Sequence, residues 1–326
     1  MSMASVTVEA QQLTKRFGMR TAVDELSFTA RQGDVVGLLG PNGAGKTTTI
    51  RLLTTVLAPT SGEFSVAGIP SARPNEIRRR VGVLPESAGY PGHQTGRDYL
   101  RYHARLFGLA RSDAERVAER LLTQVGLGER ASSRISTYSR GMRQRLGIAR
   151  ALVNDPTVVF LDEPTLGLDP AGQRQVLALV RETAQSRDAT VILSTHTLPE
   201  VEEVCGTVLI LEKGRSLVSG TVSDVTRAVA VQTSGQLRVP IDQVDRARRA
   251  LASVTGVALE VADGRPDVLT ISLTEQPGGR GDHRGDTGMN AALRAVLSAD
   301  VPVLSFEVEG VRLSDAFLTM TGEGVG

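Results

Sequence analysis

Residues 40–47 read Gly-Pro-Asn-Gly-Ala-Gly-Lys-Thr and fit the pattern G-x-x-x-x-G-K-[ST] of a phosphate-binding loop. An apolar run of strand length, residues 34–39, precedes the loop, and residues 48–57 read as a helix after it. The glycines allow a tight turn, so that consecutive N–H groups converge on phosphate oxygens at the positive end of the helix. Lys46 is placed to reach the β- and γ-phosphates, and the Thr47 hydroxyl is placed to bind Mg²⁺. The motif therefore predicts a nucleoside triphosphate site.

Two carboxylates end a second apolar run. Residues 157–161 read as a central strand of a parallel sheet, and Asp162 and Glu163 follow. Asp162 is placed to hold Mg²⁺ through water, and Glu163 could polarise the water that attacks the γ-phosphate. The next buried run leads to His196 at the same sheet edge, where the imidazole is a candidate γ-phosphate contact. The alternatives are an acidic surface cluster and a structural histidine.

Other candidate residues have two readings each. Phe17 could stack on a nucleobase or serve as a hydrophobic plug. Ser139 and Gly141 open a helix, where they present a hydroxyl and N–H groups to an anion or simply cap the helix. Asp169 and the proline after it indicate the start of another helix, which extends to about residue 186.

Hydrophobic periodicity indicates an α/β core followed by a smaller module. Strands are predicted at residues 6–9, 26–29, 34–39, 62–67, 81–84, 157–162, 190–194 and 208–211, and residues 94–153 have a helical pattern. The tail predicts a strand (236–239), a helix (244–254), two strands (257–261, 268–273), a helix (290–297) and a strand (304–308), with a loop at 276–288 and a short helix around Leu313 and Phe317. The βαββαβ order suggests a ferredoxin-like module. The predicted domains are 1–226, with a helical part at about 87–153, and 227–326.

Composition narrows the function classes. The chain has 326 residues, a net charge of +1, 3% aromatic residues and no tryptophan, so no nucleic-acid partner is expected. The single cysteine, Cys205, excludes an internal disulfide. No apolar run approaches the ~20 residues that span a bilayer, and the N-terminus lacks a signal-peptide pattern. We expect any membrane role to depend on a partner.

The motifs in this order resemble the ATP-binding-cassette ATPases. The resemblance rests on the phosphate loop, Tyr-Ser-Arg-Gly-Met at 138–142, Leu-Asp-Glu-Pro at 161–164, Leu-Gly-Leu-Asp at 166–169 and Ser-Thr-His at 194–196, and covers about two-thirds of the chain. It implies an α/β P-loop NTPase core with a mainly parallel sheet, an antiparallel β subdomain and an α-helical subdomain, beside the C-terminal α+β ferredoxin-like module.

The resemblance also implies a role for each motif residue, with ATP and Mg²⁺ as ligands. Phe17 stacks on adenine, Asp162 supports Mg²⁺, Glu163 is the catalytic base and His196 senses the γ-phosphate. Two cassettes pack head to tail in this family, so Ser139 and Gly141 serve the ATP of a second subunit. The nucleotide-contacting residues implied in this way are Phe17, Gly40, Pro41, Asn42, Gly43, Ala44, Gly45, Lys46, Thr47, Thr48, Ser139, Gly141 and Asp169.

Two segments depart from the family pattern. The family signature is Leu-Ser-Gly-Gly-Gln, and here Arg140 replaces a glycine and Met142 the glutamine. Ser139 and Gly141 are retained, so we expect ATP-dependent pairing. Glu86 stands where the family has a glutamine that reaches Mg²⁺ and the water. A carboxylate still ligates Mg²⁺ and would take part in catalysis, but it adds negative charge beside the γ-phosphate, which could slow hydrolysis or change its coupling.

Further motifs resemble one branch of the family. Pro-Glu at 85–86, the signature, the C-terminal module and Leu-Ser-Asp-Ala-Phe-Leu at 313–318 are similar to the ATPases of drug-resistance, sodium-export and polysaccharide or lipid exporters. This branch implies a second ATPase subunit, expected to be a copy of this chain, and a separate transmembrane permease that residues 87–96 contact at the cytoplasmic face of the membrane. The alternatives are a soluble cassette ATPase and an ATP-dependent regulator.

Overall fold

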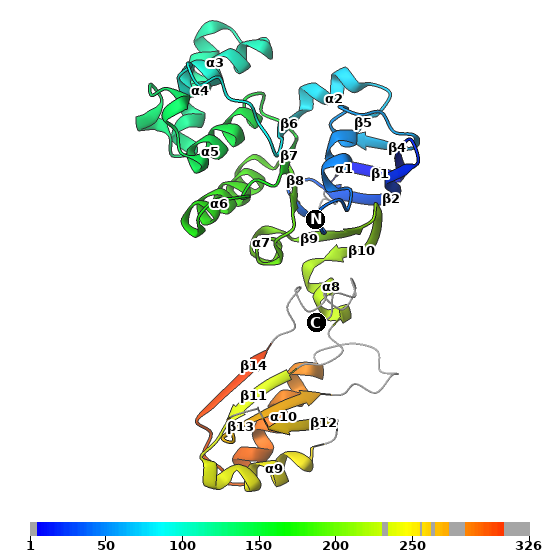
Figure 1. Cartoon of the computed structure of the whole chain (residues 1–326), viewed down its shortest axis with the longest axis vertical. Coiled ribbons are helices and arrows are strands. Elements are labelled where there is room, and N and C mark those ends of the chain that lie inside the picture. Colours follow the sequence, from blue (N-terminus) through cyan, green and yellow to red (C-terminus); the bar gives the residue numbers. More distant parts are fainter. Residues whose placement is uncertain (1–4, 230–233, 255, 262–264, 274–283, 310–326) are drawn as a thin grey trace. The chain divides into compact units, whose positions relative to one another are not determined.

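The computed structural model describes residues 5–229, 234–254, 256–261, 265–273 and 284–309. The chain forms two compact units, one ending at Val222 and the other beginning at Ser223 (Figure 1). Each unit has its own sheets and its own apolar core. The boundary predicted between residues 226 and 227 falls inside helix α8 (Val222–Val229).

The main sheet of the first unit carries the strands that end in the candidate motifs. Its strand order is β10 (Arg215–Thr221), β9 (Thr207–Glu212), β3 (Val35–Leu39), β8 (Thr190–Thr195), β7 (Val158–Asp162) and β6 (Val81–Leu84). All neighbours are parallel except β10 and β9. Every residue of β3, β7 and β8 is buried, as expected for central strands of a parallel sheet. The carboxyl ends of these three strands lie at one edge.

An antiparallel sheet packs beside the main sheet. Its order is β2 (Arg20–Arg31), β1 (Val6–Phe17), β4 (Ser61–Val66) and β5 (Ile69–Pro70). Helix α1 (Lys46–Leu53) contacts both sheets and contributes Ile50 and Leu53 to the core that they share. The predicted segments 6–9 and 26–29 are only parts of β1 and β2, because polar residues interrupt the apolar pattern and the register shifts at several points along the pair.

The remaining helices of the first unit are α2 (Pro74–Arg80), α3 (Gly96–Leu106), α4 (Arg111–Gln124), α5 (Arg140–Ala151), α6 (Pro170–Arg187) and α7 (Leu198–Val204), with the short 3₁₀ turns Gly128–Arg130 and Ile135–Thr137. Four of these helices contact the main sheet, whereas α3 and α4 pack on each other and on α5 (Figure 1). Three of these helices, α3, α5 and α6, have a side-chain N-cap. Thr95, Ser139 and Asp169 each accept a hydrogen bond from a backbone N–H in the first turn. The helical pattern predicted for 94–153 is confirmed by α3, α4 and α5.

The second unit has the predicted ferredoxin-like topology. Chain order is β11 (Ser234–Arg238), η3 (Ile241–Gln243), α9 (Val244–Ala252), β12 (Val257–Val261), β13 (Val268–Leu273), α10 (Arg284–Ser298) and β14 (Ser305–Glu309). The antiparallel sheet has the order β12-β13-β11-β14, and residues of both helices join its core. Helix α10 begins within the predicted loop 276–288, so the prediction is wrong from Arg284 on, where glycines and polar residues hide the helical period. The helix predicted around Leu313 lies outside the described residues.

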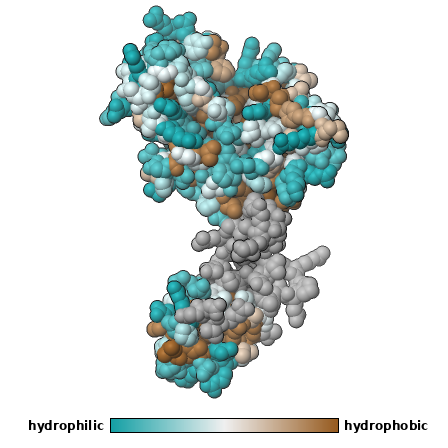
Figure 2. All heavy atoms as spheres, viewed as in Figure 1, coloured by the Kyte–Doolittle hydropathy of each residue, from teal (hydrophilic) through white to brown (hydrophobic). Residues whose placement is uncertain are grey.

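The visible face of the first unit has a mixed surface. Figure 2 shows hydrophilic and hydrophobic residues interspersed on that face of the first unit. Within the described ranges, no helix has both the length and the hydrophobicity that crossing a membrane requires.

Candidate nucleotide-binding and catalytic site

The phosphate loop connects the end of β3 to the start of α1 and depends on a glycine immediately before the helix. Gly45 has φ +106°, and a Cβ atom there would lie 2.5 Å from the Ala22 carbonyl oxygen. Only glycine fits both the backbone conformation and the space. Helix α1 then begins at Lys46, so that its unpaired N–H groups face the loop.

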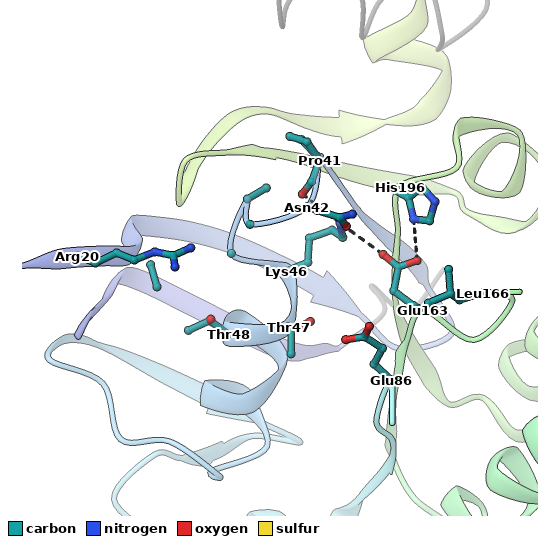
Figure 3. Close-up of a pocket in the computed structure, with 14 residues that line it drawn as sticks. Arg20, Pro41, Asn42, Lys46, Thr47, Thr48, Glu86, Glu163, Leu166 and His196 are labelled. Atoms are coloured by element: carbon teal, nitrogen blue, oxygen red, sulfur yellow. Dashed lines mark hydrogen bonds and ion pairs between the residues drawn. The ribbon is translucent and has the colours of Figure 1, made fainter. Parts of the chain in front are cut away.

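Lys46 lies across the loop. Its ammonium group donates to the carbonyl oxygens of Gly40 (2.6 Å) and Pro41 (3.3 Å). It is also 3.4 Å from the Glu163 carboxylate, and both side chains are less than a tenth exposed. Figure 3 shows the lysine directed from the loop toward the carboxylate at the end of β7. The cation is thereby held at the mouth of the loop.

Asp162 lies beside Thr47 and behind the loop. The Thr47 hydroxyl and the Ser194 hydroxyl both donate to its Oδ1, at 3.2 Å and 2.5 Å. The sheet produces this arrangement, because Asp162 and Ser194 are register partners on neighbouring parallel strands. The carboxylate is almost fully buried. A hydroxyl and a carboxylate, both hard oxygen donors, therefore meet at one point.

Glu163 has a positive φ angle, which is uncommon for a residue other than glycine. Its φ is +48°, and its N–H donates to the carbonyl oxygen (3.2 Å) and the hydroxyl oxygen (3.0 Å) of Ser194. The side chain lies between two cationic or polar groups, with Oε1 facing Lys46 and Oε2 2.9 Å from Nδ1 of His196. The imidazole is 46% exposed while the carboxylate is 8% exposed, so the histidine covers the carboxylate from the solvent side.

Lys46, Glu163 and His196 line a hollow of about 340 Å³, here called the phosphate hollow. Its lining consists of Arg20, Ala22, residues 41–48, Glu86, Glu163, Leu166 and His196 (Figure 3). The structure thus brings together most of the residues predicted to contact ATP or to act in catalysis. Gly40 and Asp162 stand behind the lining, each bonded to a residue in it.

Phe17 is not among the residues that line this hollow. Its ring is 48% exposed, and the Lys15 ammonium lies 5.2 Å from the ring centroid. Phe17 is the register partner of Arg20, which does line the hollow. The ring therefore stands at the hairpin end next to the site.

Sequence reasoning missed Arg20 and Leu166. Arg20 belongs to β2, whose predicted extent stopped short of it, so that no pattern connected it with the phosphate loop. Leu166 lies three residues after Glu163. It is 38% exposed, and the sequence gives no sign that this apolar loop residue would be exposed beside the site. A hairpin signal at Gly18 would have placed Arg20 opposite Phe17.

The structure places Ser139, Gly141 and Asp169 in a second hollow, of about 300 Å³, which shares no lining residue with the first. The Ser139 hydroxyl accepts from the Met142 N–H at 3.2 Å, and Asp169 accepts from the Gly172 N–H at 3.2 Å. Both residues are therefore caps of the helices that they begin. Within one chain they do not meet the phosphate loop.

The parallel sheet, the phosphate loop and the carboxylate pair at the strand ends define a P-loop nucleoside triphosphatase. The model of the ABC transporter family matches residues 23–166. The chain is 40% identical over 220 residues to the Nod factor export ATP-binding protein I of Mesorhizobium japonicum, covering 67% of this chain and 64% of that protein. It is 34% identical over 322 residues to the daunorubicin resistance ATP-binding protein DrrA2 of Streptomyces coeruleorubidus, covering 98% and 96%.

The chain belongs to the ABC transporter family, among the ATP-binding subunits of its exporter branch. A solved structure of an ATP binding subunit of an ABC transporter agrees, with 32% identity and a TM-score of 0.62 over 68% of this chain and 92% of that chain. The family and the branch inferred from the motifs are thus confirmed, and the chain is an ATP-binding ATPase.

Proposed function

We propose that this chain is the ATP-hydrolysing subunit of an exporter whose permease is a separate membrane protein. Binding of ATP closes a pair of subunits, hydrolysis reopens it, and the motion drives the permease. Relatives with export and resistance names support a drug-like, lipid or similar substrate. The subunit works at the cytoplasmic face of the membrane, where the permease holds it.

One observation carries the assignment of hydrolysis, namely the position of the Glu163 carboxylate between Lys46 and His196 at the phosphate hollow. A carboxylate fixed on two sides is suited to accept a proton from a water molecule that attacks the γ-phosphate. Lys46 stabilises the negative charge of the transferred group, and His196 orients the carboxylate and contacts the γ-phosphate. The bond from water oxygen to phosphorus forms as the bond to ADP breaks.

The oxygen donors of the site fit a Mg²⁺ ion that arrives with ATP. Thr47 and Asp162 place a hydroxyl and a carboxylate oxygen 3.2 Å apart, and Glu86 lines the same hollow. Such hard oxygen ligands suit Mg²⁺, which keeps several waters and binds few protein groups. When bound, the ion neutralises charge on the phosphate oxygens.

A second copy of this chain is proposed to complete each site. Ser139, Gly141 and Asp169 form a hollow that one chain cannot bring to its own phosphate loop. A head-to-tail pair would face this hollow toward the triphosphate of the partner, so that each copy supplies both surfaces. The N–H groups at the start of α5 then point at an anion.

The proposed permease contact lies between the main sheet and the helical part of the first unit. A groove of about 320 Å³ runs along β6 and the ends of α1, α3 and α5. Two of its apolar residues are exposed, Val56 at 69% and Phe107 at 43%. The segment 87–96 predicted to touch the permease leads from β6 to α3. An amphipathic helix of the permease fits such a groove.

Glu163→Gln tests the proposed hydrolysis. The variant should bind MgATP with nearly unchanged affinity, lose turnover by about 100-fold or more, and accumulate an ATP-bound dimer. Phosphate release and analytical ultracentrifugation measure these effects, with Glu76→Gln on the exposed face of α2 as the charge-matched control. Turnover equal to that of the unmodified chain would remove Glu163 from the role of base.

A further inference from the structure

Two side chains of opposite charge stand unpaired on the two surfaces proposed to meet in the pair. The Glu86 carboxylate lines the phosphate hollow, and the Arg140 guanidinium lines the second hollow. Throughout the part of the chain that the structure describes, neither side chain has a hydrogen bond or an ion pair. They are also two of the positions where the sequence departs from the family pattern.

The phosphate hollow has no surplus of positive charge for a triphosphate. Its lining contains two cations, Arg20 and Lys46, and two carboxylates, Glu86 and Glu163. Lys46 already faces Glu163 at 3.4 Å. Figure 3 shows Glu86 beside Thr47, on the side of the hollow where the proposed metal and γ-phosphate lie. The Glu86 carboxylate therefore adds an unpaired negative charge at the place where the charge of a bound triphosphate would be highest.

The second hollow has the opposite balance. Two cations, Arg140 and Arg145, line it with one carboxylate, Asp169. Arg145 is committed within its own chain, because its guanidinium donates to the carbonyl oxygens of Val125 (3.0 Å) and Gly126 (3.4 Å). Arg140 is thus the cation available to an incoming surface.

The position of Arg140 suits a contact across the pair. It is the first residue of α5 and lies between Ser139 and Gly141, the two residues proposed to face the partner's triphosphate. Its guanidinium rests against Gly167, where a Cβ atom would lie 2.6 Å from the Arg140 Cζ. The glycine therefore leaves room for the arginine on the face of the second hollow.

From these observations we infer that in the closed pair the Arg140 guanidinium compensates the carboxylate charge of the partner subunit's Glu86 beside the γ-phosphate. The inference rests on the proposed head-to-tail pairing. An arginine that approaches from the opposite surface lowers the repulsion between a carboxylate and a phosphate without adding charge to the open site. The two departures from the family pattern then act together, and each copy supplies one of them to each site.

A double-mutant cycle tests the inference. In the Glu163→Gln background, which prevents turnover, the MgATP concentration that gives half-maximal dimer is measured by analytical ultracentrifugation for the parent, Arg140→Gln, Glu86→Gln and the double variant. Arg140→Gln should raise this concentration by about fivefold or more when Glu86 is present, and by less than about twofold when residue 86 is glutamine. Arg140→Lys keeps the charge and should stay near the parent.

Arg143→Gln is the matched control, because it removes the same charge from the same helix outside the second hollow. Its effect should be equal in the two backgrounds. Equal shifts for Arg140→Gln in both backgrounds would overturn the inference, because the effect of Arg140 would then be independent of Glu86. If the Glu163→Gln parent forms no dimer with MgATP, the proposed function itself fails; a parent that pairs while the cycle is additive refutes only the charge compensation.

Discussion

At the scale of single residues, the carboxylate proposed as the catalytic base is positioned by its neighbours on the sheet. Glu163 follows β7, and its N–H is held by both oxygens of Ser194 on β8. The side chain can then face Lys46 and His196 at the same time. The same pair of strands places Asp162 against Thr47. Register between the two parallel strands thus determines that Asp162 contacts Thr47, whereas Glu163 faces Lys46 and His196.

The glycine that precedes α1 is the residue on which the loop conformation depends. Gly45→Ala combines a left-handed φ with a Cβ atom 2.5 Å from the Ala22 carbonyl oxygen. We expect it to lower the free energy of unfolding by about 2–3 kcal/mol and to weaken ATP binding. Gly68→Ala is the control, since Gly68 also has positive φ but no atom within 4 Å of its Cβ position, and should cost about 1 kcal/mol. Urea unfolding measures both, and equal losses would contradict the steric argument.

At the scale of elements, the helical part of the first unit contains a histidine that burial keeps neutral. His103 lies in α3 with its ring 4.6 Å from that of Tyr99 and 5.5 Å from that of Tyr102. Burial, and secondly the charge of Arg150, lower its pKa from 6.5 to about 4. The folded unit therefore disfavours a proton that the unfolded chain accepts.

This difference makes the stability of the first unit sensitive to acid. Between pH 6.5 and about 4 the unfolded chain binds a proton at His103 that the folded chain does not, so the free energy of unfolding falls as the pH falls. Compared with His103→Gln, the unmodified chain should lose about 1–2 kcal/mol more on going from pH 7.5 to pH 5. Urea unfolding at both pH values measures the difference, and identical pH dependence of the two proteins would show that this histidine does not titrate on unfolding.

At the scale of the whole molecule, the sequence predicts the elements that a local hydrophobic pattern determines. It does not predict the features that depend on how distant strands pair. The strand ends at Leu39 and Asp162 could be predicted, because buried parallel strands are continuous apolar runs followed by their functional residues. The long hairpin of β1 and β2 could not, because bulges break its alternation, and Arg20 was missed with it. The ferredoxin-like order of the second unit was predicted from βαββαβ succession alone. Residue pattern alone also did not predict that Ser139 lies away from the phosphate loop of its own chain. That prediction came from the resemblance to a family in which two subunits pack head to tail.

The proposed permease groove yields the prediction that concerns the complete exporter. Phe107 is 43% exposed at the end of α3 and lines the groove, and it lines neither the phosphate hollow nor the second hollow. Phe107→Asp places a charge where an apolar helix face would dock, so the tagged chain should sediment with native membranes about tenfold less while ATP-driven pairing in the Glu163→Gln background is unchanged. Leu217→Asp, at a similarly exposed apolar residue of β10, is the control and should leave membrane association intact. Undiminished sedimentation of Phe107→Asp would move the permease contact away from this groove, because burying an unpaired carboxylate there would prevent a contact of the proposed kind.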